Sequence, residues 1–167
     1  MSYIASFYLV DEADSEALAS SAEIIPKSRR VLGIIPRTVV DTKEAFWETI
    51  NSKAKELEGF QHSGFAFVDL LTMYPEIEAN SHFTLGARLT QSMDSLCLSF
   101  TYSEALNAMA ILGPRYPSRE EIAEFMGEEG RNSEATQPEV AIQSAWESMI
   151  RWLSQVEDGY IGLVLVG

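Results

Sequence analysis

The sequence predicts a single α+β domain, in which a mixed or antiparallel sheet that includes a strand from each end of the chain is covered by helices. Three observations lead to this expectation. Short apolar runs of strand character occupy residues 2–10 and 160–167, helical periodicity recurs between them, and 46% of the 167 residues are hydrophobic. A chain of this size buries roughly 70% of the surface that its unfolded form exposes. We therefore expect residues 1–167 to share one core.

The first third of the chain predicts a strand followed by two helices. Residues 2–10 are rich in aromatic and β-branched side chains, and the acids of residues 11–16 suit the first turn of a short helix. Asp41 and Glu44 have capping-box spacing at the start of a second helix, which Gly59 would end. The apolar face of this second helix would comprise Phe46, Ile50, Ala54 and Leu57.

The middle of the chain is ambiguous between strand and helix. The run GFAFVDLLTM, residues 64–73, is compatible with a strand buried on both faces or with a helix segment, and Gly64 and Pro75 on either side favour the strand. Residues 83–92 are compatible with either state. Residues 95–101 have the character of a strand.

The last third predicts three helices and a final strand. Ser103 is expected to cap the first of these helices, and Ser118 with Glu121 has capping-box spacing for the second. Pro138 begins the longest helix. Its apolar stripe comprises Ile142, Ala145, Trp146, Met149, Ile150, Leu153 and Val156. If the apolar segment 160–167 were exposed to water, the protein would lose ~1.5–3 kcal/mol of stabilising free energy for each side chain that could otherwise be buried. We therefore expect this segment to be a strand inside the sheet.

Charge argues against nucleic-acid binding. The 25 acidic and 12 basic residues give a net charge of −13, which repels a phosphate backbone. Residues 26–40 are the exception, because they contain Lys27, Arg29, Arg30 and Arg37 without an acid. This segment could hold an anionic ligand, but a surface segment that balances the acidic first helix is favoured, since it lacks the stacking aromatics of a nucleic-acid footprint.

Cysteine content and hydropathy bear on the cellular compartment. Cys97 is the only cysteine, so no intramolecular disulfide can form, and its apolar neighbours predict a buried, unreactive thiol. The apolar N-terminal run lacks the basic residues of a signal peptide, and no apolar stretch approaches the ~20 residues of a membrane span. We expect a cytoplasmic protein that does not enter membranes.

Motifs for catalysis, cofactors and metals are missing from the sequence. It contains neither of the glycine-rich phosphate-binding motifs, G-x-x-x-x-G-K-[ST] and G-x-G-x-x-G, and it lacks the G-x-S-x-G motif of a nucleophilic serine. The residues around His62 and His82 do not have the spacing of metal ligands. Asp69 is the one acid in the run 64–73, where we expect it to pair, with Arg88 as a candidate partner. If a small-molecule cleft exists, its polar lining is predicted to be His62, Asp69, Tyr74 and His82.

Two functions remain after these exclusions. The first is a protein-interaction module, of immunity or regulatory type, that captures a basic partner through acidic patches at residues 11–16 and 127–135. Acidity that serves only solubility is the plainer alternative. The second is a small-molecule-binding domain or enzyme with a pocket near residues 62–82. Trp152, at the edge of its helix's apolar stripe, could also form a homodimer contact.

Both ends of the chain resemble those of a known family. The opening MSYIASFYLVDEADSEALASS and the close MIRWLSQVEDGYIGLVLVG are similar to the corresponding segments of the YfbM-like family of small bacterial proteins. The tryptophan followed by Leu-His and Leu-Thr-Gly steps in the middle of that family is not reproduced. The resemblance implies an α+β cytoplasmic domain and no particular reaction.

Overall fold

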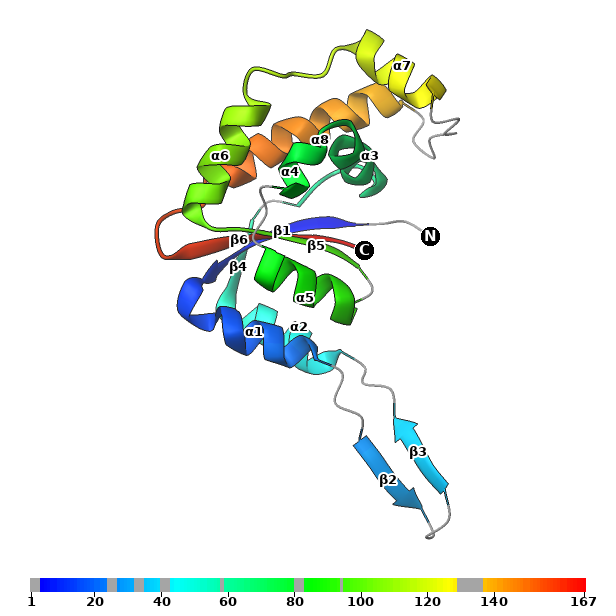
Figure 1. The fold of residues 1–167 in the computed structure, drawn as a ribbon, viewed down its shortest axis with the longest axis vertical. Coiled ribbons are helices and arrows are strands. Elements are labelled where there is room, and N and C mark those ends of the chain that lie inside the picture. The colour runs from blue at the N-terminus through cyan, green and yellow to red at the C-terminus, as the bar shows by residue number, and fades with distance from the viewer. Residues whose placement is uncertain are drawn as a thin grey trace.

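A four-stranded antiparallel sheet forms the centre of the protein in the computed structural model (Figure 1). The structure describes residues 4–23, 27–31, 35–39, 43–57, 59–79, 83–93, 95–128 and 137–167. The strand order is β4-β1-β6-β5. The strands are β1 (Ala5–Asp11), β4 (Ala54–Glu56), β5 (Leu96–Phe100) and β6 (Tyr160–Val166).

The two terminal strands are neighbours at the middle of this sheet. The register of β1 and β6 runs from Ala5 opposite Val166 to Asp11 opposite Tyr160. Backbone hydrogen bonds between Ile4 and Gly167, of 2.9 and 3.0 Å, extend the pairing beyond both strands. The expectation of an antiparallel sheet that includes both terminal strands is confirmed.

One face of the sheet carries five helices, which enclose the larger part of the core (Figure 1). Side chains of alternate strand positions, including Phe7, Phe100 and Val164, are completely buried beneath them. The helices are α3 (Phe65–Met73), α4 (Pro75–Ala79), α6 (Tyr102–Leu112), α7 (Arg119–Glu128) and α8 (Pro138–Leu153). The longest helix therefore begins at Pro138, as predicted.

Trp152 of α8 lies at the centre of this core. Its ring stacks on Phe7 of β1 at 5.3 Å between centroids and on Phe67 of α3 at 5.1 Å, with interplanar angles of 22° and 9°. Because Trp152 is completely buried within its own chain, the expected homodimer contact through this side chain is wrong. A homodimer formed through another surface stays a prediction.

The other face of the sheet is covered by three helices (Figure 1). They are α1 (Ser15–Ala22), α2 (Glu44–Lys53) and α5 (Phe83–Met93), and a short 3-10 helix, η1 (Glu12–Asp14), connects β1 to α1. Helix α5 approaches β5 closely, since a Cβ atom on Gly86 would lie 3.0 Å from the carbonyl oxygen of Cys97. The backbone N–H of Gly86 donates to the buried hydroxyl of Ser99 at 3.0 Å. The sheet is thus sandwiched between two helical layers.

The predicted strand over residues 64–73 is wrong, because this segment forms helix α3. Its buried side chains are Ala66, Phe67, Leu70 and Leu71, which recur with helical rather than alternating spacing. Gly64 precedes the helix and Pro75 begins α4. Residues 83–92, left open between two states, belong to helix α5.

The helix expected over residues 41–59 is shorter in the structure. It spans Glu44–Lys53 and is followed directly by strand β4, which pairs with β1. Gly59 therefore does not cap it. Leu57 is buried, but beyond the helix, where its N–H donates to the carbonyl of Phe7 at 2.9 Å. Asp41, the expected capping residue, lies outside the described residues.

Two of the predicted helix starts can be compared directly with the structure. Ser118 and Glu121 form the expected capping box of α7, with hydrogen bonds of 2.8 and 3.2 Å. For α6 the expectation of a Ser103 cap is wrong. Thr101 is the N-cap residue, and its backbone N–H donates to the Glu104 carboxylate at 2.8 Å.

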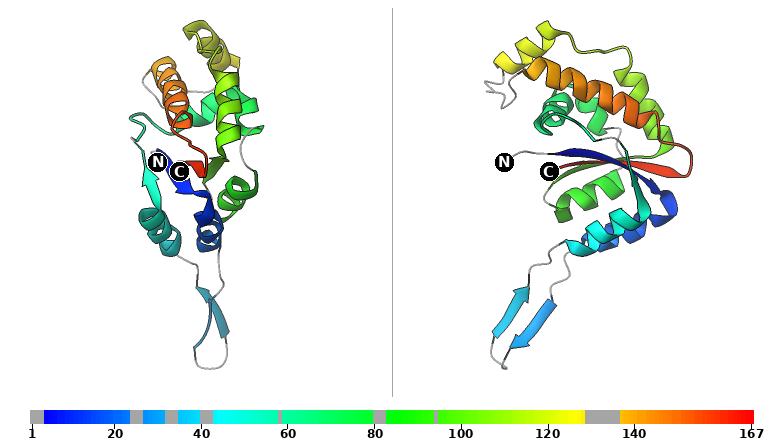
Figure 2. Two further views of the ribbon diagram at one scale, coloured as in Figure 1. Left: turned by 90° about the vertical axis from the view of Figure 1, so that its left-hand side faces the viewer. Right: turned by 180° about the vertical axis from the view of Figure 1, so that it is seen from behind.

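Strands β2 (Lys27–Val31) and β3 (Ile35–Val39) form a separate two-stranded ribbon. Figure 2 shows from two further directions that this ribbon extends away from the two helical layers. The register pairs Arg29 with Arg37. The described part of the basic segment is therefore a pair of antiparallel strands that lies between α1 and α2 in the sequence. Within the described parts of the chain, no helix is both long and apolar enough to cross a bilayer.

Candidate functional site

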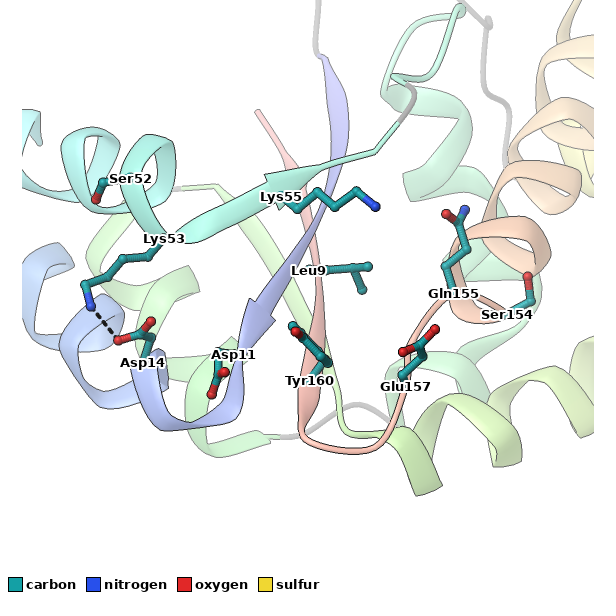
Figure 3. Close-up of a pocket in the computed structure, with 10 residues that line it drawn as sticks. All are labelled: Leu9, Asp11, Asp14, Ser52, Lys53, Lys55, Ser154, Gln155, Glu157 and Tyr160. Carbon is teal, nitrogen blue, oxygen red and sulfur yellow. Dashed lines mark hydrogen bonds and ion pairs between the residues drawn. The ribbon is translucent and has the colours of Figure 1, made fainter.

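A pocket of about 780 Å³ opens at the end of the sheet where β1 finishes and β6 begins (Figure 3). Its residues come from three regions that lie far apart in the sequence. They are Leu9 and Asp11 of β1, Asp14 of η1, Ser52 and Lys53 of α2, Lys55 of β4, Ser154, Gln155 and Glu157 after α8, and Tyr160 of β6. We call this the acidic pocket.

The floor of the acidic pocket is set by the register of the sheet. Asp11 and Tyr160 are direct partners on adjacent strands, and the next row of the same face pairs Leu9 with Lys55 on one side and Gly162 on the other. A Cβ atom on Gly162 would come within 2.6 Å of the Phe7 ring. The sheet therefore places a carboxylate beside an aromatic ring at the mouth and an aliphatic side chain behind them.

Two lysines line the wall on the side of α2 and β4. The ammonium of Lys53 lies 2.5 Å from the carboxylate of Asp14, which secures the end of α2 to η1. Lys55 extends from β4 across the pocket toward Gln155 (Figure 3). One of the two cations is thus held by an acid of the wall itself.

The opposite wall is the C-terminal end of α8. The last carbonyl groups of a helix carry about half a negative charge, so this end favours cations. Ser154 and Gln155 lie there, and the chain then turns through Gly159, whose φ of +84° suits glycine. The carbonyl of Gly159 accepts a 2.9 Å hydrogen bond from the N–H of Glu12. This bond joins η1 to the turn before β6, and both segments carry acidic residues.

Acids outnumber bases around the opening. Asp11 and Glu157 are exposed lining residues, and the residues that follow them, Glu12 and Asp158, are also exposed. Tyr160 is 42% exposed among them. The lining therefore contains three acids, Asp11, Asp14 and Glu157, and two lysines, and the adjacent Glu12 and Asp158 are exposed. A negative opening with an exposed aromatic ring can attract and hold a cationic group.

The four residues predicted to line a small-molecule cleft are placed differently. His62 is exposed before α3, with its ring 5.4 Å from that of Phe60. Tyr74 follows the other end of α3, a helix about 13 Å long. The structure therefore does not bring His62 and Tyr74 together. Asp69 is half-buried within α3, and His82 lies outside the described residues.

The Tyr74 side chain connects two segments of the fold. Its hydroxyl donates to the carbonyl of Arg115 at 3.1 Å, which links α3 to the segment after α6. Burial raises the pKa of Tyr74, and the negative charge of Glu121 adds to this effect. None of the three pockets described in the structure is lined by His62, Asp69 or Tyr74. Ligand binding by these residues stays a prediction.

Three further expectations concern Arg88, Cys97 and metals. Arg88 pairs with Glu16 and Glu23 of the α1 region, so its assignment to Asp69, on the other face of the sheet, is wrong. Cys97 is buried, and this burial raises the pKa of its thiol to about 11. Among the residues that the structure describes, no group of three or more His, Cys, Asp or Glu side chains is arranged to hold a metal ion.

The sequence predicted one of the acidic segments that line the acidic pocket. The acidic stretch 11–16 was singled out there as a patch, and Asp11 and Asp14 line the pocket. Glu157 and Tyr160 were missed, because nothing local indicates that the turn after the last helix lies beside the end of the first strand. The other patch, residues 127–135, lies almost entirely outside the described residues.

Comparison with known proteins yields no match. No family model matches the chain, and neither the curated proteins nor the solved structures contain a match to it. The resemblance to the YfbM-like family stays a prediction, and the functional argument depends on the pocket alone.

Proposed function

We propose that the protein is an interaction module, of regulatory or immunity type, whose acidic pocket receives a basic segment of a partner protein. The paired positions of Asp11 and Tyr160 at the mouth of the pocket are the observation that carries this proposal. A Lys or Arg side chain entering there would meet a carboxylate and the face of an aromatic ring at once. The cytoplasm is the compartment expected from the sequence.

The surrounding charges favour a partner of this kind. Glu157 and the C-terminal end of α8 add negative potential on one side, and on the other Lys53 and Asp14 offset each other, which leaves Asp11 and Glu157 against Lys55 in the lining. Leu9, at the floor, offers an apolar surface to the aliphatic stem of a long cationic side chain. A net charge of −13 would also accelerate encounter with a basic protein at low salt.

The proposal is tested with a tetra-arginine peptide as the probe, by calorimetric titration at low ionic strength and at about 1 M salt, where the Debye length is about 3 Å. The double variant Asp11→Asn, Glu157→Gln removes two charges from the pocket. Asparagine keeps the oxygen that accepts from the N–H of Ala13 at 2.9 Å. We expect binding about tenfold weaker, equivalent to about 1.4 kcal/mol, and lost at high salt.

The matched control is Glu120→Gln, Glu124→Gln on α7, which changes the net charge equally at exposed positions away from the acidic pocket. It should leave the peptide affinity within about threefold of the parent, since distant surface charges are screened. Equal weakening by both double variants would show that the peptide follows overall charge, and the assignment to the pocket would then be wrong.

A further inference from the structure

A second pocket, of about 310 Å³, lies on the face of the sheet that α1, α2 and α5 cover. Trp47 of α2 and Met93 at the end of α5 form its sides, and Tyr8, Cys97 and Leu165 of the strands form its base. Ile4 and Gly167 line it, so it lies where β1 begins and β6 ends, whereas the acidic pocket lies where β1 ends and β6 begins. We call it the apolar pocket.

The described residues of its lining carry no charge. Besides the apolar side chains they include the hydroxyls of Ser6, Tyr8 and Ser95 and the Cys97 thiol. Burial raises the pKa of the thiol to about 11, and burial with nearby Glu56 raises that of Tyr8, so both groups keep their protons at neutral pH. The lining thus combines an apolar wall with a few neutral hydrogen-bonding groups, as ligand pockets do.

Lys43 connects the two sides of the apolar pocket. Its ammonium donates to the carbonyl of Met93, which joins the start of α2 to the end of α5. Among the described residues it is the one residue other than glycine with a positive φ, of 60°. A left-handed backbone costs a lysine about 1 kcal/mol or more, so the surrounding structure must hold it there. The gap between α2 and α5 is therefore spanned by a fixed connection.

Large apolar side chains at the rim are open to solvent. Trp47 is 43% exposed and Ile4 is 65% exposed, although both border a concave, apolar space. We propose that the apolar pocket binds a small uncharged molecule with a flat aromatic or short aliphatic body and one hydrogen-bonding group. An apolar cavity of about 150 Å³ already accepts benzene, so the larger volume here admits two fused rings.

The polarity of the pocket selects for this class of ligand. An ammonium placed among these side chains would lose its hydration without meeting an opposite charge in the described lining, which is costly. The nearby Lys43 ammonium already donates to the Met93 carbonyl. A single hydroxyl or amide can instead bond to Ser6, Ser95 or Tyr8. Binding here is independent of the acidic pocket, because the two sites share no described lining residue.

The test uses 2-naphthol as the probe and follows the indole N–H resonance of Trp47 by NMR during titration. We expect saturable shifts with a dissociation constant on the order of 100 µM. Ser6→Leu, which fills the pocket from β1, and Trp47→Ala, which removes one side, should each weaken binding about tenfold, with calorimetry replacing the indole signal in the second. Tyr102→Ala, an equally exposed aromatic on α6, is the control and should bind unchanged.

The outcomes separate the proposal from its competitors. Loss of binding in both pocket variants, with their thermal unfolding still cooperative and the control unaffected, supports it. No saturable shift, or equal weakening in all three variants, overturns it. Concentration-dependent association that Trp47→Ala abolishes, without binding of 2-naphthol, would also overturn it, because the apolar rim would then be a contact between two copies of the chain.

Discussion

At the scale of the residue, Arg88 connects two helices through charge. Its guanidinium donates to Glu16 at 2.8 Å and to Glu23 at 2.7 Å, which fastens α5 to the α1 region. The hydrogen bonds from Arg88 hold the pKa of Glu16 below its ordinary value. A lowered pKa in the folded state gives stability that is present above the unfolded pKa and is lost as the pH falls through the folded one.

We therefore expect Arg88→Met to lower the melting temperature at neutral pH and to have a smaller effect near about pH 3, because the contribution of the pair declines as the pH falls below the ordinary glutamate pKa toward the lowered pKa of Glu16. Thermal unfolding followed by circular dichroism at the two pH values measures this. In the Glu16→Gln, Glu23→Gln background the same substitution should change the melting temperature much less at neutral pH. A pH-independent loss would assign the role of Arg88 to packing instead.

The partners of Arg88 could not be predicted from the sequence. The sequence indicated that a charge near an apolar run needs a partner, but the choice between Asp69 and the acids of the α1 region depends on which face of the sheet each helix covers. Trp152 is similar. Its place at the edge of a helical stripe suggested exposure, whereas α3 and β1 complete the burial of its ring. Neither placement is encoded in local spacing.

At the scale of the element, helix α6 offers a comparison between two neighbouring hydroxyls. Thr101 forms both halves of the capping box with Glu104, whereas Ser103 lies within the helix. We expect Thr101→Ala to lower the free energy of unfolding by about 1 kcal/mol, because a helix-terminal N–H loses its acceptor, and Ser103→Ala by less than about 0.5 kcal/mol. Urea denaturation measures both. Equal losses would mean that Thr101 contributes no more than its neighbour.

Elements with complete local signals were predictable. Helix α8 carries a proline start and a long apolar stripe, and the Ser118 and Glu121 spacing that begins α7 is confirmed. Helix α3 was not predictable in this way, because nearly every side chain of residues 64–73 is apolar and so periodicity hardly distinguishes helix from strand. The three-residue strand β4 was likewise assigned to the preceding helix, since its pairing with β1 is a tertiary contact.

At the scale of the whole molecule, the sequence indicated that both ends of the chain are anchored, but not that they are partners. Pairing β1 with β6 brings η1 next to the turn before β6, and the acidic pocket exists because of that junction. A contact between segments separated by the full chain leaves no mark in composition or periodicity. The pairing of the terminal strands therefore determines where the acidic pocket forms as well as the order of the strands in the sheet.

Deleting residues 160–167 should consequently abolish cooperative folding. β6 pairs with β1 on one side and β5 on the other, and it buries Ile161, Leu163, Val164, Leu165 and Val166. At ~1.5–3 kcal/mol for each of these five side chains, the loss is comparable with the 5–15 kcal/mol by which domains are typically stable. Urea denaturation followed by near-ultraviolet circular dichroism should show no transition.

The matched control replaces residues 27–39 with a short glycine and serine linker. β2 and β3 pair with each other and with none of the other described strands, so their removal takes no strand from the central sheet. We expect this variant to keep a cooperative transition at nearly the same urea concentration. A cooperative transition after loss of residues 160–167, or its disappearance after loss of the ribbon, would contradict the view that stability resides in the sheet joined by the two chain ends.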